Sequence, residues 1–432
     1  MFYLALNKGS SSLKFCLYSL KSISPILSGK LTNYKPEEYS FVFTFQGESK
    51  NIPVTSSQYL DASVLVLNLI KELKIADDFS EIIVIHRIVH GGNKFIQPTL
   101  LNKQIIEELE LVSKLAPLHN PLVIAEIKLL WNNFPQLQQI AAFDTSFHQT
   151  LPEINQIYAL PIAAYTKYGI KRFGFHGLSH SFVSAEYYRL KSLENPNILN
   201  KYTEQTNNQV DNSSSSKVGK IICLHLGSGS SLCAIKDGVS YQTSMGFSPN
   251  EGLPMATRSG DTNFDAINYY MENAEIEAKD IPEILNKKSG VLGISGYTNN
   301  FVDLVNDYET NSSAKLALDY FVERVVEKLG GYMTALGGVE AIIFTGAIGE
   351  GSSFIRRKIC ERFSFMSLFL DQELNLHAGQ NNPGSPLKDL LTSAEIISSA
   401  ESKIQVWVIP TGEELQMVRE SRKMLNSNNL KF

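Results

Sequence analysis

The alternation of hydrophobic and polar positions predicts a mixed α/β protein. Apolar runs of strand length recur between polar or glycine-rich turns, and longer segments with apolar residues three or four apart separate several of them. Strand-like runs lie at 2–20, 81–92, 138–152, 221–241, 339–345 and 404–410; helix-like segments lie at 63–73, 102–134 (broken by "APLHNP" at 116–121) and 313–336. Strands that alternate with helices favour an α/β architecture.

One strand–turn–strand pattern occurs twice. Residues 2–20 and 221–241 each contain an apolar strand, a glycine–serine turn and a second apolar strand, with "NKGSSSL" and "HLGSGSSL" at corresponding places. Repetition of the turn together with its strands indicates a duplicated domain. Residues 195–220 are polar and poor in aromatic side chains, which predicts a flexible surface loop.

Three glycine-rich turns suggest that the protein binds an anion. They follow apolar strands, at 9–12, 227–231 and 346–351. Glycine lets the backbone approach a ligand closely, and successive N–H groups with nearby hydroxyls can surround a phosphate. One such turn is usually only structural, whereas three in similar contexts favour a phosphate ligand. The first turn also carries Asn7, Lys8 and Lys14, which is more polarity than a hairpin needs.

Composition and missing motifs narrow the class of protein. The 432 residues are 43% hydrophobic and 19% charged with a net charge of −5, so nothing global favours nucleic acid or an anionic membrane. The stretch "GSGSSL" lacks the third glycine of a dinucleotide motif and leads into a strand, and no P-loop motif is present. No membrane span or signal peptide is expected, and the four cysteines predict buried, reduced thiols in a cytoplasmic protein.

Several polar side chains follow buried strands or lie in short motifs. The segments "HRIVHGG", "FDTSFHQTLP", "RFGFHGLSH" and "EGLPMATRSGD" supply Arg87, His90, Asp144, His148, His176, His180 and Arg258. A single histidine is most often structural. A buried arginine is harder to dismiss, because an uncompensated buried charge is costly. A pair of arginines aimed at one anion suits a phosphate or carboxylate.

Taken together, these segments resemble the acetate/propionate kinase family, within the superfamily of actin, Hsp70 and sugar kinases. "NKGSSSLKF", "APLHNP", "HLGSGSSL", "FTGAIGE" and "IPTGEEL" complete a set that follows the family's order over nearly the whole chain. The resemblance implies duplicated actin-like (ribonuclease H-like) α/β domains around a central cleft. It implies phosphoryl transfer from ATP to acetate, giving ADP and acetyl phosphate, with Mg²⁺ or Mn²⁺ as the metal and a homodimer as the assembly.

The resemblance also assigns roles by position. Asn7 and Glu413 would hold the metal, and Ser10, Ser12 and Lys14 would approach the nucleotide phosphates. Arg87 and Arg258 would clamp the carboxylate and the phosphoryl group, and His176 would stabilise that group. The family assigns Asp144 an acid/base role; because a carboxylate nucleophile carries no proton at neutral pH, we expect Asp144 instead to position an arginine. Lys8 is expected to add charge near the same site.

The remaining implied contacts concern the acyl group and the nucleotide. The acyl pocket maps to Val89, Leu118, Phe175 and Pro249. The second phosphate loop maps to His225, Leu226, Gly227, Ser228 and Gly229. The nucleotide segments map to Gly346, Ala347, Ile348, Gly349, Glu350 and Gly351, and to Asn300, Phe301 and Val302.

The chain departs from the family pattern on the nucleotide side. Ser228 replaces the usual asparagine, Ala347 and Gly351 alter "GGIGEN", and Gly412 alters "PTNEE". Asn300 and Val302 stand where the family has an Asp-x-Arg that contributes to the nucleoside site. These changes predict a working kinase with weakened or altered nucleoside preference.

The expected organisation is an N-terminal domain of residues 1–150 plus 412–432 and a C-terminal domain of residues 151–411. Alternatives remain for the activity. Propionate kinase differs only in the acyl pocket, and butyrate kinase is a more distant relative. A degenerate member that binds nucleotide as a sensor or scaffold is a further alternative, although retention of Arg87, Asp144, His176 and Arg258 argues against it.

Overall fold

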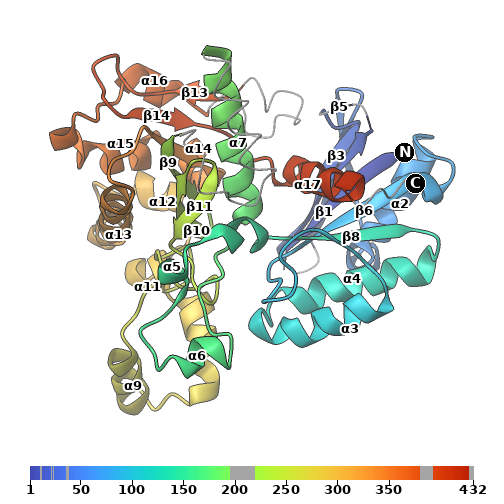
Figure 1. The fold of residues 1–432 in the computed structure, drawn as a ribbon, viewed down its shortest axis with the longest axis horizontal. Helices are drawn as coiled ribbons and strands as arrows, with labels where there is room; N and C mark the ends of the chain where they lie inside the picture. The colour runs from blue at the N-terminus through green and yellow to red at the C-terminus, as the bar shows by residue number, and fades with distance from the viewer. Residues whose placement is uncertain are drawn as a thin grey trace.

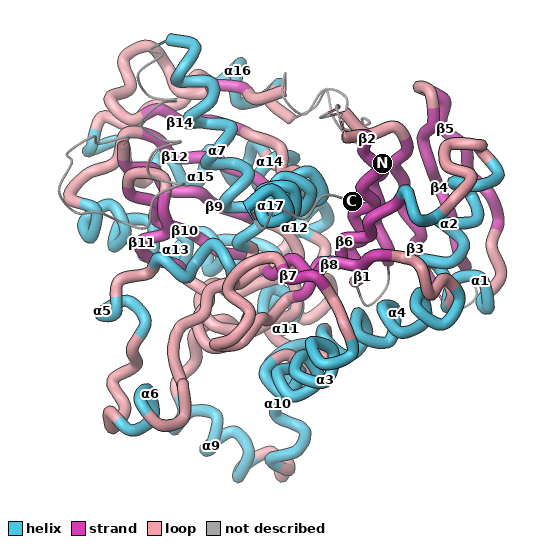
Figure 2. The backbone as a smooth tube through the Cα atoms, turned by 45° about the vertical axis from the view of Figure 1, so that its right-hand side comes forward, coloured by secondary structure: helices cyan, strands magenta, loops and turns pink. Residues whose placement is uncertain are grey.

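A computed structural model of the chain contains two β-sheets with helices packed around them (Figures 1 and 2). The structure describes residues 1–9, 12–20, 22, 24–35, 38–194, 219–379 and 393–427. Within these ranges no helix is both long and apolar enough to cross a membrane. Ser10 and almost all of the polar segment 195–220 lie outside the described residues.

The N-terminal half forms an eight-stranded sheet in the order β5-β4-β3-β2-β1-β6-β8-β7. Its strands are β1 (Phe2–Lys8), β2 (Ser12–Ser19), β3 (Leu27–Lys35), β4 (Glu38–Phe45), β5 (Glu48–Pro53), β6 (Ile82–Ile88), β7 (Thr99–Leu100) and β8 (Gln138–Phe143). The helices α1 (Ser56–Leu60), α2 (Ala62–Glu72), α3 (Lys103–Val112) and α4 (Asn120–Asn133) belong to the same half. As expected, "APLHNP" separates α3 from α4, and Pro121 stands in the first turn of α4, where its missing N–H costs nothing.

The C-terminal half forms a six-stranded sheet in the order β11-β10-β9-β12-β14-β13. Its strands are β9 (Lys220–Leu226), β10 (Ser230–Lys236), β11 (Val239–Thr243), β12 (Ala341–Thr345), β13 (Glu395–Ile396) and β14 (Gln405–Val408). The accompanying helices are α5 (Glu153–Gln156), α6 (Ala163–Thr166), α7 (Gly177–Glu194), α9 (Phe264–Asn273), α10 (Ile281–Glu283), α11 (Gly290–Ser295), α12 (Phe301–Asn306), α13 (Ser312–Leu336), α14 (Gly346–Gly351), α15 (Ser353–Glu361) and α16 (Gln372–His377).

The two sheets repeat one topology, which bears out the duplication expected from the sequence. In each, three antiparallel strands are followed by two parallel ones: β3-β2-β1-β6-β8 corresponds to β11-β10-β9-β12-β14. Within the hairpins, Asn7 is paired with Lys14 and His225 with Ser231. Gly9, which follows β1, and residues 227–229, which follow β9, are therefore at equivalent positions in the two halves.

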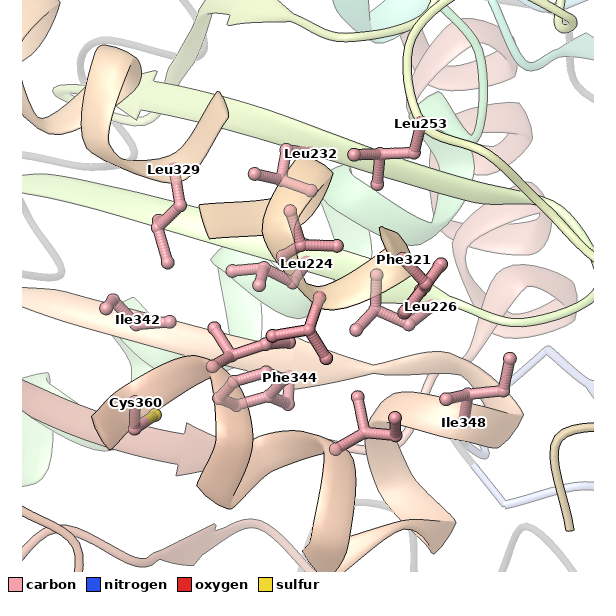
Figure 3. Close-up of a cluster of buried hydrophobic side chains, with 14 of the residues drawn as sticks. Leu224, Leu226, Leu232, Leu253, Phe321, Leu329, Ile342, Phe344, Ile348 and Cys360 are labelled. Carbon is pink, nitrogen blue, oxygen red and sulfur yellow. The ribbon is translucent and has the colours of Figure 1, made fainter. Parts of the chain in front are cut away.

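The central strands β1, β6, β9 and β12 are buried along almost their whole length because both of their faces are covered, whereas β5 at the sheet edge is exposed. In the C-terminal half, side chains of β9, β10 and β12 pack against α13 and α15 (Figure 3). Leu224, Leu232, Phe321 and Phe344 are fully buried there. All four cysteines are buried and free, as the sequence analysis expected.

The last helix, α17 (Glu413–Ser427), lies between the two halves (Figure 1). It packs on β1, β6 and β8 of the first sheet and on α7 of the second half. Arg419 donates to Glu186 of α7 at 2.8 Å, and Arg422 donates to the carbonyl of Ser19 at 2.6 Å. The helix thus joins the halves directly beside the carboxyl ends of the parallel strands.

Two local expectations need correction. Residues 346–351 form the short helix α14 rather than a turn, because Thr345 ends β12 and the chain turns at once into helical geometry. Lys8 does not face the side of Asn7: its Nζ lies 3.7 Å from Glu126 Oε2 and 5.6 Å from the Tyr59 ring centroid. Successive side chains of a strand point to opposite faces of the sheet, so Lys8 lies on the face opposite to that of Asn7.

Candidate functional site

Three polar side chains meet at the carboxyl ends of adjacent parallel strands. Asn7 comes from β1, Arg87 from β6, and Asp144 follows β8 directly. The strands are neighbours in the order β1-β6-β8, so their ends share one edge of the sheet. Glu413, the first residue of α17, lies near the other end of the sequence and contacts Arg87 at the same edge.

Arg87 is the hydrogen-bonding centre of this group. Its Nε donates to Asp144 Oδ1 at 2.8 Å and its Nη2 to Asp144 Oδ2 at 2.7 Å, a bidentate pair. Its Nη1 donates to Asn7 Oδ1 at 3.2 Å and to Glu413 Oε2 at 3.1 Å. Four hydrogen bonds fix the guanidinium plane, and the carboxylate of Asp144 accepts two of them.

The charges in this cluster are mutually dependent. Burial alone would lower the pKa of Arg87, but Asp144 and Glu413 hold it above its usual value. Burial raises the pKa of Asp144, and Arg87 opposes that rise. For Glu413, burial is outweighed by Arg87, His225 and other donors, so the pKa of its carboxyl group is lowered.

The oxygens around Asn7 fit a hard divalent cation. Asn7 and Glu413 are 8% and 7% exposed, and Asn7 Nδ2 donates to Glu413 at 3.1 Å and to Glu414 at 3.2 Å. Mg²⁺ is usually held by one or two carboxylates while water and phosphate oxygens supply the rest. No group of three acidic, histidine or cysteine side chains that could hold a metal ion occurs in the described part of the chain.

The C-terminal half contributes a second group, formed by His176, Gly229 and Arg258. A Cβ placed on Gly229 would lie 3.2 Å from His176 Nε2 and 3.5 Å from Arg258 Nη1. The absent side chain therefore leaves a small space between an imidazole and a guanidinium. His176 has the left-handed φ of 55°, which is uncommon outside glycine and often marks a functional position.

The two arginines are close enough to repel each other. Burial, and then the like charge of Arg87, lower the pKa of Arg258. Arg258 donates only to the Pro249 carbonyl at 3.1 Å and to Met255 Sδ at 3.7 Å, and it has no carboxylate partner within the described residues. Arg87 is already paired with Asp144 and Glu413, so Arg258 is the arginine of the pair whose charge an anion would compensate.

Neutral histidines and hydroxyl groups line the interior behind this space. The rings of His176 and His225 stack with centroids 4.2 Å apart. Ser231 Oγ lies 2.9 Å from His176 Nδ1 and 2.8 Å from His180 Nε2, and Ser179 Oγ lies 2.7 Å from His225 Nδ1. Burial lowers the pKa of His225 to about 4, so the ring is uncharged at neutral pH.

Part of the expected acyl pocket forms an apolar cluster. Val89 and Phe175 pack together with Met245 and Met255. Pro249 adjoins them through its carbonyl bond with Arg258, whereas Leu118 is 48% exposed and belongs to none of the described core clusters. His90, which lies beside the cluster, packs its ring on Phe175 with centroids 5.3 Å apart and is structural.

The expected nucleotide segments divide into two regions. The second phosphate turn lies against α14, since a Cβ on Gly346 would be 2.7 Å from the Leu226 carbonyl oxygen. Glu350 Oε1 accepts from Gly346 N at 2.8 Å and from Thr411 N at 3.1 Å, which ties α14 to the residues before Glu413. The expected contact residues of this region are His225, Leu226, Gly227, Ser228, Gly229, Gly346, Ala347, Ile348, Gly349, Glu350 and Gly351.

Residues 300–302 form the second region and are less well suited to a ligand. Asn300 caps α12 by accepting from Val302 N at 3.0 Å. Phe301 is 7% exposed and packs on Phe321, so its ring faces the core rather than a ligand. Val302 is 63% exposed. A nucleoside contact here would come from the backbone, from the side-chain NH2 of the exposed Asn300 or from the aliphatic side chain of Val302.

Sequence reasoning missed several residues that complete the site. They are Glu414, which accepts from Asn7, Ser231, which bridges two histidines, and Met245 and Met255, which line the apolar cluster. Met255 stands three positions before Arg258, and this spacing could have suggested that the two side chains line the same part of the site. The other contacts join residues more than fifty positions apart, which no local pattern reports.

Gly412, a departure noted in the sequence, has a packing explanation. A Cβ at this position would lie 2.5 Å from the Phe182 ring of α7. Glycine therefore allows α17 to begin against that ring.

Lys14 is exposed on β2 and still acts electrostatically on Glu413, Glu350 and His225, so it faces the same space.

Comparisons with known proteins agree with this geometry. The sequence profile of the acetokinase family matches residues 2–419. An acetate kinase of Clostridium novyi (strain NT) is 37% identical over 432 residues, 99% of each chain. An acetate kinase of Campylobacter jejuni is 37% identical over 429 residues, 98% of this chain and 99% of that one.

Solved structures show the same fold. The propionate kinase of Francisella tularensis gives a TM-score of 0.80 at 31% identity, covering 97% of this chain and 98% of that one. The acetate kinase of Porphyromonas gingivalis gives 0.80 at 32% identity, covering 98% and 99%. These matches confirm the expected duplicated actin-like α/β fold. The chain belongs to the acetokinase family.

Proposed function

We propose that this member of the acetokinase family transfers the terminal phosphoryl group of ATP to acetate, giving ADP and acetyl phosphate. Family membership over nearly the whole chain supports ATP and a short carboxylate as substrates. The observation that carries the proposal is that His176 and Arg258 both lie beside Gly229, with no carboxylate bound to Arg258 among the described residues, while Arg87 is near enough to act on both electrostatically.

The arginines would act by neutralising charge in the transition state. Phosphoryl transfer needs mainly in-line positioning and electrostatic stabilisation, and no covalent protein nucleophile. Arg87 is held rigidly by Asp144, and Arg258 is held by the Pro249 carbonyl. Between them, the carboxylate of acetate and the phosphoryl group in transit would replace the repulsion of two cations by attraction.

His176 and the glycine turns would bind the phosphoryl oxygens. The neutral ring of His176, with Nδ1 accepting from Ser231, would direct its Nε2–H toward the space beside Gly229. Backbone N–H groups of 227–229, Ser12 and Lys14 would bind the remaining phosphate oxygens, with Ser10 beside them in sequence. Asp144 would act as a positioning residue, since a carboxylate nucleophile has no proton to remove.

A divalent cation, Mg²⁺ or Mn²⁺, would be held by Asn7 and Glu413, with Glu414 orienting Asn7. When bound, such an ion neutralises phosphate charge and stabilises the leaving group. Glu413 is the first residue of α17, and this helix contacts both halves of the molecule. We propose the division into domains 1–150 plus 412–432 and 151–411, with closure about this junction excluding water from the acyl phosphate.

Hydroxylamine trapping of the acyl phosphate tests the activity. The protein, ATP and Mg²⁺ are incubated with acetate, propionate or butyrate, and the hydroxamate is measured. Acetate should react best, because Val89, Phe175, Met245 and Met255 fill the space behind the arginines. Preference for propionate would assign the second candidate, which the similar propionate kinase structure favours; no hydroxamate with any acid would leave only the sensor or scaffold alternative.

The nucleoside preference is proposed to be weak. Asn300 and Val302 stand where the family pattern has an Asp-x-Arg that contributes to the nucleoside site, and Val302 is exposed. Rates with ATP, GTP and inorganic polyphosphate should be similar, and the double variant Asn300→Asp, Val302→Arg should favour ATP. A strict preference of the wild type for ATP would contradict this part of the proposal.

A homodimer is proposed as the assembly. The segment around α5 and α6 and the helix α9 lie at one end of the C-terminal half (Figures 1 and 2). Large exposed apolar side chains occur on both: Ile154, Ile157, Leu160, Ile162, Tyr168, Phe264, Tyr269 and Tyr270. A surface of this kind typically marks an interface. The double variant Ile162→Glu, Phe264→Glu should be monomeric by light scattering if a second copy covers it.

A cytoplasmic location is also proposed. The support is the chemistry of the four cysteines, which are buried and carry no disulfide. Such thiols are typical of reducing compartments.

A further inference from the structure

The position of Arg258 depends on one irregular loop. Its Nη1 donates to the Pro249 carbonyl at 3.1 Å, and the described residues provide no carboxylate partner. Pro249 lies in residues 244–251, which form no helix or strand. Whatever holds this loop in place therefore determines where the guanidinium of Arg258 points.

Three side chains outside the strand-end site hold the loop. Glu251 Oε1 pairs with Arg172 Nη2 at 2.7 Å, and Glu251 Oε2 accepts a short hydrogen bond from the Tyr158 hydroxyl. Phe247 N donates to that hydroxyl at 2.6 Å and to Glu251 Oε2 at 3.3 Å. The guanidinium of Arg172 lies over the Tyr158 ring, 5.4 Å from its centroid. The three side chains therefore contact one another and the backbone of the loop.

The cluster is packed tightly and anchored at both sides. A Cβ on Gly246 would overlap the Glu251 carboxylate and the Tyr158 hydroxyl, so the loop can run here only with glycine. Arg172 N donates to the Gln156 carbonyl at 2.7 Å, which fixes the segment that carries Tyr158. Burial and the neighbouring Glu251 raise the pKa of Tyr158, so its hydroxyl remains a donor at all working pH values.

We propose that Tyr158, Arg172 and Glu251 are positioning residues of the phosphoryl-transfer reaction, which hold the Pro249 carbonyl and through it aim Arg258 at the anion. The inference rests on the proposed function. None of the three is placed against a substrate. Their effect is expected in the transition state, because misplacing a catalytic group by about 1 Å can cost about 10²-fold in rate.

Tyr158→Phe is the sharpest probe because it removes one oxygen and keeps the ring. We expect kcat for acetyl phosphate formation to fall about 10- to 100-fold while KM for ATP changes by less than about two-fold. A ring without the hydroxyl leaves Phe247 N and Glu251 less well bound, so the loop and Arg258 shift together. The melting temperature is measured alongside to show that the variant is folded.

Tyr308→Phe is the matched control. The Tyr308 hydroxyl donates to Asp319 Oδ1 at 2.6 Å beside Lys315, so it belongs to a similar tyrosine–carboxylate–cation cluster, away from loop 244–251. This variant should retain wild-type kcat and KM. If both phenylalanine variants lose activity equally, the loss reflects a general destabilisation of the fold, and the inference is wrong.

A second variant tests whether the effect passes through Arg258. In an Arg258→Lys background the lysine cannot bind the Pro249 carbonyl as the guanidinium does, so adding Tyr158→Phe should cost less than about three-fold. An equal loss in both backgrounds would overturn the inference. So would an unchanged kcat for Tyr158→Phe in an otherwise active protein. A wild-type protein that forms no acetyl hydroxamate would instead overturn the proposed function.

Discussion

At the scale of single residues, Arg87 joins the parts of the site. From its own strand it bonds the side chain of Asn7 in a second strand, that of Asp144 after a third strand, and that of Glu413 in the last helix. The sequence alone predicted Arg87, Asp144, Asn7 and Glu413 because each lies in a recognisable segment. It could not predict that Glu414 also binds Asn7, or that Tyr158 binds Glu251 of the loop 93 residues further along, since such contacts arise only when the chain folds.

Asp144→Asn tests the positioning role of Asp144. The amide cannot accept both hydrogen bonds from Arg87, so the guanidinium should tilt, and kcat should fall about 10²-fold. The rate is measured by hydroxamate formation at saturating acetate and ATP. Glu110→Gln, which removes an exposed ion pair with Lys128, is the control and should be active. A fully active Asp144→Asn protein would refute the positioning role.

At the scale of elements, the hairpins β1–β2 and β9–β10 occupy equivalent positions in the two sheets, and the phosphate-binding role proposed for their connections rests on this equivalence. The alternation of apolar residues predicted these strands, and the strand termini followed from the polar turns. The helix at 346–351 was not predicted, because glycine-rich sequence usually indicates a turn. There the surrounding β9 and β12 strands, rather than local propensity, determine the conformation.

Gly229→Ala tests whether the second turn borders the phosphoryl site. The added methyl group would lie 3.2 Å from His176 Nε2 and 3.5 Å from Arg258 Nη1, so it would occupy the space proposed for the phosphoryl oxygens. We expect kcat/KM for ATP to fall at least about ten-fold. The melting temperature should change little because Gly229 does not need a positive φ.

Gly331→Ala on α13 is the matched control for this substitution. A Cβ there meets nothing within 4 Å, and alanine favours a helix over glycine by about 0.5–1 kcal/mol. The control should be active and slightly more stable. A Gly229→Ala protein with wild-type kinetics would place the phosphoryl group elsewhere.

At the scale of the whole molecule, buried histidines make the stability of the folded protein depend on pH. Burial lowers the pKa of both His90 and His148 to about 4. The His148 ring bridges Ser240 at 2.8 Å and the Phe175 carbonyl at 3.0 Å, so its protonation would place a buried positive charge between distant segments. No sequence pattern distinguishes these rings from exposed ones, because burial is a property of the complete fold.

Stability is predicted to fall at acid pH. The unfolded chain binds a proton at each histidine below about pH 6.5, whereas the folded chain does not until about pH 4. Stability is therefore complete above pH 6.5 and is lost as the pH falls toward 4, by about 1.4 kcal/mol per histidine at about pH 5.5. Urea unfolding at about pH 7.5 and 5.5 measures this, and His148→Gln should show a smaller difference. An equal difference in both proteins would contradict the prediction.

The central claim is that Arg87 at the strand ends stabilises the transferring phosphoryl group, and its most direct test is the hydroxamate rate of Arg87→Ala. Arg362→Ala, which removes an exposed arginine paired with Glu323, is the matched control. We predict a loss of about 10³-fold or more for Arg87→Ala and none for Arg362→Ala. A folded Arg87→Ala protein that forms acetyl hydroxamate within a few-fold of the wild-type rate would contradict the account.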